Sequence, residues 1–346
     1  MILSSRYKND EVAVLKLNDI QREYIGRVKK KLRGGVYNYE TVPCAVCNQT
    51  LFEPVSHKDR YGFELSVVIC RHCGLAQTNP RMNHASYNQF YEQEYRYIYG
   101  GEQGPTEMFF NDQYNRLGKK IFDFITKALG NPSIQGKFVL EVGCGAGGIL
   151  KYFKDKGCIV KGIDLGSEFI KYGRESHNLD LMVGDIASLN LTKQPDIIIY
   201  SHVLEHILDL KDQLKKIFNM MNKDTVLYIE VPGLKNLHHS YEGDLLLYLQ
   251  NAHVYHFTMT SLGNLMHSNG FETILIDEYV RSLFKKENSV NVSNQVKNEY
   301  PEIAHYLKKI EQMRMILPMP IYVMKFRAKR IVYNVLRFFR LVSPLK

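Results

Sequence analysis

FVLEVGCGAGGIL, residues 138–150, combines an apolar β-type segment, a glycine-rich turn and the start of a helix. Gly143, Gly145 and Gly148 satisfy the spacing G-x-G-x-x-G, which is typical of turns that bind dinucleotides. A turn with this composition can also serve only to pack a helix against a strand. The residues around the turn must therefore decide whether it binds a ligand and, if so, which one.

Acidic residues accompany this turn on three successive predicted strands. Glu141 stands two residues before the first glycine of the turn, Asp164 ends the strand IVKGID, and Asp185 ends the strand LMVGD. The carboxyl ends of parallel strands line one crevice, so we expect the three acids to face one ligand. An acid about 20 positions after the glycines suits a ribose diol. Asp185 is then placed for the exocyclic amine of an adenine.

The charge of Glu141 distinguishes between two cofactors. A carboxylate beside the turn repels a diphosphate, whereas it suits an ammonium group or the water around it. S-Adenosylmethionine carries a sulfonium and an amino group, while NAD carries two phosphates. The sequence therefore favours S-adenosylmethionine and leaves a nicotinamide dehydrogenase as a distant alternative.

Strand and helix patterns alternate after residue 132, with strands predicted in KFVLEV, CIVKGID, LDLMVGD, PDIIIYS, TVLYIEVP and FETILIDEYV. This alternation predicts an α/β fold with a doubly wound, mostly parallel sheet. At 346 residues with 45% hydrophobic residues, the chain is long enough for two domains with a buried core. We predict a helical lead-in over 1–40, a zinc-binding module over 41–82, a helical connector or lid over 83–132, a cofactor-binding domain over 133–295, and a helical basic tail over 296–346.

Four of the six cysteines form two C-x-x-C pairs separated by 22 residues. Cys44 and Cys47 make the first pair, and Cys70 and Cys73 make the second. Pairs with this spacing bind one tetrahedral zinc ion, with sulfurs about 2.3 Å from the metal. A closed site of four thiolates is structural because it leaves no position open to a substrate. We therefore predict a structural zinc ion. We expect that the nearby His57 and His72 do not bind it.

The segments EVGCGAG (141–147) and SHVLEHI (201–207), with the two aspartates that end the next strands, resemble class I S-adenosylmethionine-dependent methyltransferases. The cysteine module narrows the resemblance to the group with a zinc-binding domain before the methyltransferase domain, which includes sugar C-methyltransferases and relatives in surface-polysaccharide biosynthesis. The resemblance covers residues 41–280. It implies an S-adenosylmethionine site made of Glu141, Gly143, Gly145, Asp164, Leu165, Asp185, Ile186 and Ser201.

Methyl transfer also requires a group that takes the proton of the acceptor, and histidine is the usual candidate because its pKa lies near neutrality. His253 is the first choice, since it follows the fifth predicted strand and the related sugar enzymes have a histidine there that acts as base. Glu230 ends that strand, and His206 follows the fourth strand beside Glu205. These residues are also compatible with packing or with hydrogen bonding to a loop carbonyl.

The acceptor is expected to be a sugar, a nucleotide sugar or another glycan precursor. Related C-methyltransferases have Tyr-x-Glu-His where this chain has Gln250-Asn-Ala-His253, and they carry a second long domain, whereas about 66 residues follow Val280 here. Methylation of a hydroxyl is thus at least as well supported as methylation of carbon. The alternatives are an rRNA or tRNA methyltransferase with a zinc module, and a non-catalytic binding protein on the same fold.

The net charge of +9 is concentrated at the end of the chain. Residues 325–346 carry seven basic and no acidic side chains, which leaves 9 − 7 = +2 for the rest. The tail can either dock on its own domain or lie as an amphipathic helix on an anionic membrane surface. Because the charge clusters in the tail, nucleic acid is not the expected partner. We expect a soluble cytoplasmic protein, peripheral at the inner membrane face if the tail binds lipid.

Tyrosines recur every fourth residue from 87 to 99 and thus share one helical face. Such a face can form an aromatic lid over a sugar acceptor. Packing between the zinc module and the main domain is the favoured interpretation, because most aromatic faces are buried.

Overall fold

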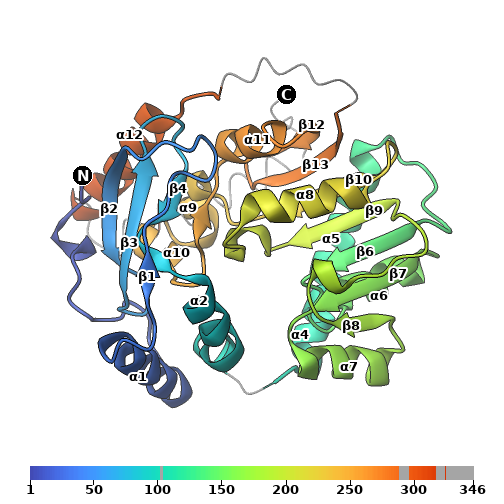
Figure 1. The fold of residues 1–346 in the computed structure, drawn as a ribbon, viewed down its shortest axis with the longest axis horizontal. Helices are drawn as coiled ribbons and strands as arrows, with labels where there is room; N and C mark the ends of the chain where they lie inside the picture. The colour runs from blue at the N-terminus through green and yellow to red at the C-terminus, as the bar shows by residue number, and fades with distance from the viewer. Residues whose placement is uncertain (102–103, 288–295, 317–323, 325–346) are drawn as a thin grey trace.

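The computed structural model describes residues 1–101, 104–287, 296–316 and 324 (Figure 1). The basic tail of 325–346 and its expected membrane contact lie outside these residues. Among the described helices, none has the length and apolar composition that a bilayer span requires.

The chain after residue 137 forms a seven-stranded sheet in the order β12-β13-β10-β9-β6-β7-β8. Strands β6 to β10 pair in parallel, whereas β13 runs antiparallel to β10 and to β12. The mostly parallel, doubly wound sheet predicted from the sequence is therefore confirmed. Its strands are β6 (Phe138–Val142), β7 (Ile159–Asp164), β8 (Leu181–Val183), β9 (Ile197–Ser201), β10 (Val226–Glu230), β12 (Phe271–Ile276) and β13 (Arg281–Lys286).

The last predicted strand, 271–280, was wrong in extent, because the chain turns back at Asp277. The Asp277 carboxylate accepts hydrogen bonds from the backbone N–H groups of Tyr279 and Arg281, and Val280 takes a φ of 56°. This local turn ends β12 and starts β13, which the sequence pattern did not predict. The antiparallel hairpin completes the sheet beside β10.

Helices cover both faces of this sheet (Figure 1). Ile197 and Ile199 of β9 pack with the apolar sides of α5 and α6, while Ile198 and Tyr200 face the side covered by α8 and α11. Successive strand residues point to opposite faces, so this strand is buried on both. The helices are α5 (Lys119–Ala128), α6 (Gly148–Asp155), α7 (Ser167–His177), α8 (Leu210–Met220) and α11 (Met259–His267).

The N-terminal part contains a second sheet, which the sequence analysis did not predict. Its order is β11-β4-β3-β2, and its cysteine-bearing turns lie at strand ends. Strand β11 comes from the region after β10, so the two parts of the chain share this sheet. The strands are β2 (Phe52–Lys58), β3 (Glu64–Cys70), β4 (Ala76–Thr78) and β11 (Tyr255–His256), with a separate pair β1 (Tyr39–Glu40) and β5 (Arg81–Met82).

Helices join the two parts, and one apolar core runs through both of them. It includes Val28 of α1, Tyr37 and Phe90 from the N-terminal side, and Leu214 and Phe257 from the sheet side. The remaining helices are α1 (Asp19–Arg33), α2 (His84–Phe90), the π-helix η2 (Tyr91–Tyr95), α3 (Arg96–Gly100), α4 (Glu107–Asp112), the π-helix η3 (Gln113–Gly118), α9 (Leu237–Ser240), α10 (Leu245–Tyr248) and α12 (Tyr300–Ile316). Single 3-10 turns are η1 (Ser5–Tyr7), η4 (Ile186–Ser188), η5 (Leu204–His206) and η6 (Leu234–Asn236).

Candidate active site

The glycine turn between β6 and α6 comes very close to the segment that follows β9. Gly143 has a φ of 73°, and a Cβ added there would lie 2.3 Å from Cγ2 of Val203. Its N–H donates to the carbonyl of Ile163 at 2.8 Å, which fixes the turn against β7. Gly145 also has a positive φ of 54°. Glycine is therefore required at 143 both for the backbone conformation and for space, and it is favoured at 145 for the conformation.

Asp164 at the end of β7 binds this turn and a cation from the connector. Its Oδ2 accepts from the Gly145 N–H at 2.9 Å, and its Oδ1 accepts from the Gly166 N–H at 2.7 Å. Nη2 of Arg96, on α3, lies 2.9 Å from the same Oδ1. The Arg96 guanidinium also stacks over the ring of Phe169 at 4.1 Å. The carboxylate predicted for a ribose diol is thus already paired within the chain.

Glu141 lies behind the turn and is 1% exposed. Its Oε2 has no hydrogen-bond partner among the described residues. Burial, with the nearby charge of Asp164, raises the pKa of Glu141 well above its usual value. A buried carboxyl group without a partner is costly unless a ligand, a water or a proton satisfies it.

The other predicted cofactor residues differ in exposure. The Leu165 side chain is 64% exposed beside Asp164, which makes it available to cover an adenine ring, whereas Ile186 is buried in the core. Asp185 caps η4, with its Oδ1 accepting from the backbone N–H groups of Ala187 and Ser188. Capping alone accounts for an aspartate at this position.

The segment after β9 holds a histidine that the sequence analysis did not single out. Ser201 ends β9 opposite Glu230 of β10, and His202 follows with a φ of 57° and a side chain that is 45% exposed. Its Nδ1 lies 3.6 Å from Glu205 Oε1 and its Nε2 lies 3.9 Å from Glu230 Oε1. Burial lowers the pKa of His202, but Glu205 and Glu230 outweigh that effect and raise it above its usual value.

Glu205 is the centre of a buried group of side chains. It is 1% exposed, and neither of its carboxylate oxygens has a hydrogen-bond partner among the described residues. Nε2 of His206 and Nε2 of His253 each lie 3.8 Å from its Oε1. The structure thus brings together two of the three predicted catalytic residues, 47 positions apart, around an acid.

The third predicted catalytic residue, Glu230, is held by a cation. Lys120 Nζ of α5 lies 2.5 Å from Glu230 Oε1, and the Tyr228 hydroxyl donates to Oε2 at 2.7 Å. Burial opposes ionisation, but the charges of Lys120 and His202 prevail and lower the pKa of Glu230. Glu230 is therefore ionised and poorly suited to accept a proton.

The position of His253 depends on the N-terminal sheet. Its carbonyl accepts from the Thr78 hydroxyl at 3.2 Å, and its ring lies against the Gln250 amide. The neighbouring Asn251 N–H donates to Asp59 of the β2–β3 turn at 2.9 Å. His253 is 5% exposed, and burial, with the charges of His206 and the buried His256, lowers its pKa well below its usual value.

The tyrosines that share a helical face form a ladder beside this group. The rings of Tyr91 and Tyr95 stack with centroids 4.3 Å apart, and Tyr95 stacks on Tyr99 at 5.7 Å. Both Tyr91 and Tyr95 also contact the ring of His206 edge-on, at 5.8 and 5.6 Å. Tyr87 is buried and donates to the Ala252 carbonyl at 2.7 Å. Tyr87, at one end of the ladder, therefore packs in the interior, whereas Tyr91 and Tyr95 in its middle line the candidate site.

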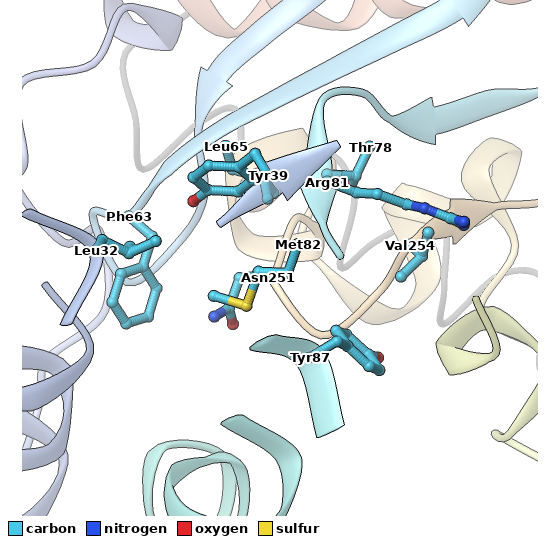
Figure 2. A pocket seen from close by; sticks show the side chains of 10 residues that line it. All are labelled: Leu32, Tyr39, Phe63, Leu65, Thr78, Arg81, Met82, Tyr87, Asn251 and Val254. Atoms are coloured by element: carbon cyan, nitrogen blue, oxygen red, sulfur yellow. The ribbon is translucent and has the colours of Figure 1, made fainter. Parts of the chain in front are cut away.

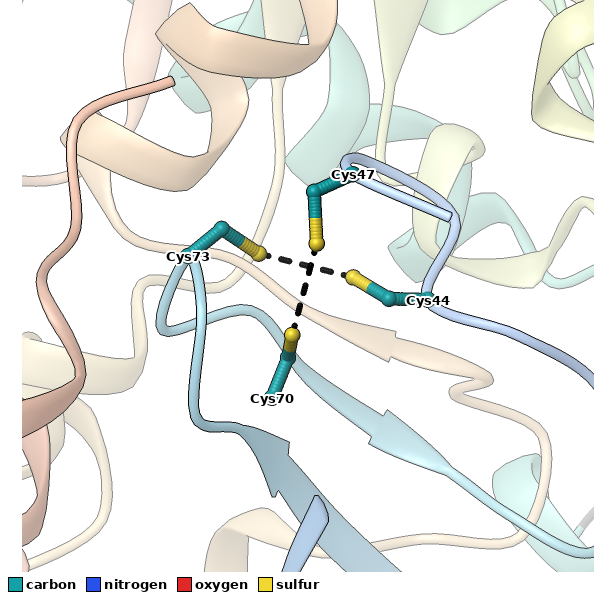
Figure 3. Close-up of side chains that lie close together, drawn as sticks. All are labelled: Cys44, Cys47, Cys70 and Cys73. Carbon is teal, nitrogen blue, oxygen red and sulfur yellow. Dashed lines mark hydrogen bonds between the residues drawn. The ribbon is translucent and has the colours of Figure 1, made fainter. Parts of the chain in front are cut away.

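The four paired cysteines converge at the edge of the N-terminal sheet. The sulfurs of Cys44 and Cys73 lie 3.4 Å apart, as do those of Cys47 and Cys70. Figure 3 shows the lines that join these two pairs crossing near one point. All four sulfurs lie within 4.8 Å of one another. His72 is exposed and stands apart from this set in the contacts described.

A small cavity separates the N-terminal sheet from the connector (Figure 2). Its volume of about 10 Å³ is that of a single water, so it is too small for an acceptor. It is lined by Leu32, Tyr39, Phe63, Leu65, Thr78, Arg81, Met82, Tyr87, Asn251 and Val254. The candidate site is therefore the edge of the larger sheet and not this cavity.

The chain matches known methyltransferases over its C-terminal part. A sequence model of a methyltransferase-domain family matches residues 112–276. Over 115 residues the chain is 29% identical to the probable (S)-tetrahydroprotoberberine N-methyltransferase 2 of Papaver bracteatum, covering 31% of this chain and 32% of that relative. Over 117 residues it is 29% identical to a malonyl-[acyl-carrier protein] O-methyltransferase of Enterobacter lignolyticus, covering 33% and 46%.

The matches to complete relatives are partial. The chain spans about a third to a half of the length of these curated relatives. A solved plantazolicin methyltransferase in complex with SAH aligns with 58% of this chain and 94% of its own, at 14% identity and a TM-score of 0.44. The family match covers the glycine turn, the three acids and the segment after β9. Residues 112–276 are therefore similar to a methyltransferase domain.

Proposed function

We propose that the whole protein transfers a methyl group from S-adenosylmethionine to a hydroxyl of a sugar, nucleotide sugar or other glycan precursor, with carbon as the alternative acceptor atom. The observation that carries the proposal is the set of His202, Glu205, His206 and Glu230 at the ends of β9 and β10, next to the glycine turn. The close approach of Val203 to Gly143 puts these residues beside the predicted cofactor turn. Ligands of open α/β sheets bind at this edge.

The cofactor would be held by the turn and by the strand ends. The glycine turn at Gly143 and Gly145 would hold the methionine end, with Glu141 just before it on β6 and Ser201 at the end of β9. Asp164 and Asp185 suit the ribose and the adenine amine, and Leu165 offers an apolar cover. Ile186 supports this cover from the core.

His202 is proposed to take the proton of the acceptor. Of the histidines around Glu205 it is the most exposed, so it is the one most accessible to an acceptor. When bound, S-adenosylmethionine supplies an electrophilic methyl group. The acceptor oxygen gives its proton to Nε2 of His202 and bonds to the methyl carbon, and the C–S bonding pair remains on sulfur. Glu230, fixed by Lys120, lies 3.9 Å from the same Nε2 and stabilises the charged form of His202.

The tyrosine ladder supports a sugar-type acceptor. Stacked rings beside carboxylates and imidazoles offer an apolar face together with hydrogen-bonding groups, which is the combination that a sugar ring requires. Tyr91 and Tyr95 already line the group at His206. The ladder would therefore orient the acceptor relative to His202.

The cysteine group is proposed to hold a structural zinc ion. Four sulfurs around one zinc ion at about 2.3 Å lie roughly 3.8 Å apart, close to the 3.4 Å observed. Cys73 leads directly into β4, whose Thr78 binds the His253 carbonyl. Zinc would thus stabilise the strand that positions His253. Zinc content measured on the purified protein tests this assignment, and a metal-free protein that folds normally would contradict it.

The methyl-transfer proposal is tested in two steps. Calorimetry with S-adenosylhomocysteine measures cofactor binding, and a panel of nucleotide sugars with methyl-labelled S-adenosylmethionine identifies the acceptor. We expect tight binding of S-adenosylhomocysteine and label transfer to at least one nucleotide sugar. Absence of S-adenosylhomocysteine binding would contradict the proposed activity, whereas labelling of RNA and no sugar would replace the acceptor class.

A further inference from the structure

We propose that Glu205, His206 and His253 form a second metal site, which binds a divalent transition ion such as Zn²⁺ and leaves one position for the acceptor oxygen. The inference deepens the proposed function and rests on it for the role of the ion. The cysteine group is a separate site at the edge of the other sheet (Figure 3).

The burial of Glu205 favours a bound ion. A carboxylate that is 1% exposed, and for whose two oxygens the described part of the chain offers no hydrogen-bond partner, is expensive to bury. Nearby histidine rings do not remove this cost by hydrogen bonding, since the closest ring nitrogen lies 3.6 Å away. An ion between the carboxylate and the rings satisfies both at once.

The distances between the three side chains also suit a bound ion. One donor atom from each of the three side chains lies within 4.8 Å of the other two. Ligands at about 2.0–2.2 Å from a tetrahedral zinc ion lie roughly 3.4 Å apart. The 3.8 Å from Glu205 Oε1 to Nε2 of His206 and of His253 exceeds this value by a few tenths of an ångström. A small movement of the side chains, with Nε2 of His253 released from the Gln250 amide, therefore closes the site.

The types of side chain in this group also suit a metal ion. Two imidazoles and one carboxylate form the ligand set of catalytic zinc sites, in which the fourth position is open to water or substrate. Four thiolates, by contrast, close the site around the ion. An ion at Glu205 would bind the acceptor oxygen and ease the loss of its proton to His202, whose Nδ1 lies 3.6 Å from Glu205 Oε1.

The fold holds these donors in place from three directions. Glu205 and His206 lie in η5 directly after β9, whereas His253 is fixed through its carbonyl to β4. The stacked rings of Tyr91 and Tyr95 support His206. Donors that are held by separate packed elements lose little freedom when an ion binds.

The competing occupant is a proton shared between Glu205 and a histidine. Metal content distinguishes the two. We expect the purified protein to hold two equivalents of zinc, and Glu205→Gln and His253→Gln to hold one. His84→Gln, at an exposed histidine at the start of α2, is the matched control and is expected to keep two.

Cobalt spectroscopy gives a readout that does not depend on activity. Co²⁺ bound by four thiolates shows strong sulfur-to-metal charge transfer, whereas Co²⁺ bound by imidazole and carboxylate shows only weak visible bands. A titration of the dialysed protein should show both sets, and the variants should lose only the weak set. Removal of an outer partner of a ligand already weakens metal binding about 10–100-fold, so loss of a ligand should weaken the second site at least 100-fold.

Each result is interpretable by itself. One equivalent of metal in both the wild type and the variants, with no weak bands on titration to millimolar Co²⁺, would overturn the second metal site. Glu205 would then share a proton with a histidine instead. S-Adenosylhomocysteine binding, measured on the same samples, shows that the variants are folded. If the wild type bound two metals but no S-adenosylhomocysteine, the proposed function would fail while the metal site stood.

Discussion

The two halves of the sheet edge differ in whether their carboxylates have hydrogen-bond partners. At β7 and β8, Asp164 and Asp185 are bound by backbone N–H groups, and Asp164 also by Arg96. After β9, both oxygens of buried Glu205 have no hydrogen-bond partner among the described residues. Apart from Glu141 of β6, whose Oε2 also has no partner among the described residues, the first half is internally satisfied. The half after β9 has the donors and acceptors of a site that needs a further ligand.

This difference separates two kinds of ligand binding. A group already bound in the chain must exchange its partner when a ligand arrives, so its contribution to affinity is a difference between two bonds. A group without a partner contributes the relief of its burial cost as well. We therefore expect substitutions near Asp164 to change cofactor affinity mildly, and substitutions after β9 to change catalysis strongly.

The largest effect on cofactor affinity is expected at Gly143, where the glycine turn contacts Val203 of the segment after β9. Gly143→Ala puts a Cβ 2.3 Å from Val203 Cγ2 at a residue whose φ is 73°. Strain on the order of 3 kcal/mol, about 100-fold in affinity, should prevent the turn from binding S-adenosylhomocysteine in calorimetry. Gly26→Ala, in α1 with no atom within 4 Å of the added Cβ, is the matched control. It should bind normally.

A second variant separates the clash from the conformational strain. Val203→Ala removes the methyl group that the new Cβ would meet, so the double variant should regain part of the lost affinity. If Gly143→Ala alone binds S-adenosylhomocysteine as tightly as the wild type, the turn does not carry the cofactor.

His202→Asn should lower kcat by about 100-fold or more, within the range observed for loss of a general base. Asparagine tolerates the positive φ of this position, so the backbone is preserved while the imidazole is lost. S-Adenosylhomocysteine affinity should change less than twofold. His202→Gly is the control for backbone strain and should be equally inactive. If either variant retained the kcat of the wild type, a residue other than His202 would be the base.

The layout of the half that contains the glycine turn was largely predictable from the sequence, because its signals are local. The glycine turn, Asp164 and Asp185 all lie at strand ends that short apolar runs predict. The half after β9 was only partly predictable. His253 reaches Glu205 through the pairing of β11 with β4, and such pairing over about 180 residues leaves no local pattern.

Two further features were missed for related reasons. The hairpin of β12 and β13 depends on one aspartate that caps a turn, and the N-terminal sheet depends on strands shared by both parts of the chain. His202 was inside a quoted motif, but its importance comes from its positive φ and its exposure, which only the structure reports.

Substitution of Asp185 tests whether a carboxylate that already has partners within the chain also binds the cofactor. Asp185→Ser keeps an N-cap of similar quality, so the free energy of unfolding should change by less than about 0.5 kcal/mol. If the carboxylate also accepts from the adenine amine, affinity for S-adenosylhomocysteine should fall by about 5–10-fold, the effect of one lost hydrogen bond. Unchanged affinity would restrict Asp185 to its role as a cap.

Arg96→Met should give the smallest effect and the opposite sign. The Arg96 guanidinium holds Asp164 Oδ1 at 2.9 Å, where a ribose hydroxyl would have to donate. The pair is partly exposed, so it is worth about 0.2–1 kcal/mol, which corresponds to a gain of up to about fivefold in affinity for S-adenosylhomocysteine when it is removed. Methionine preserves the apolar contact with Phe169, and Arg96→Lys retains a cation as the control. Weaker binding by Arg96→Met would mean that the arginine itself contacts the cofactor, and the satisfied half of the edge would then be a preformed part of the site.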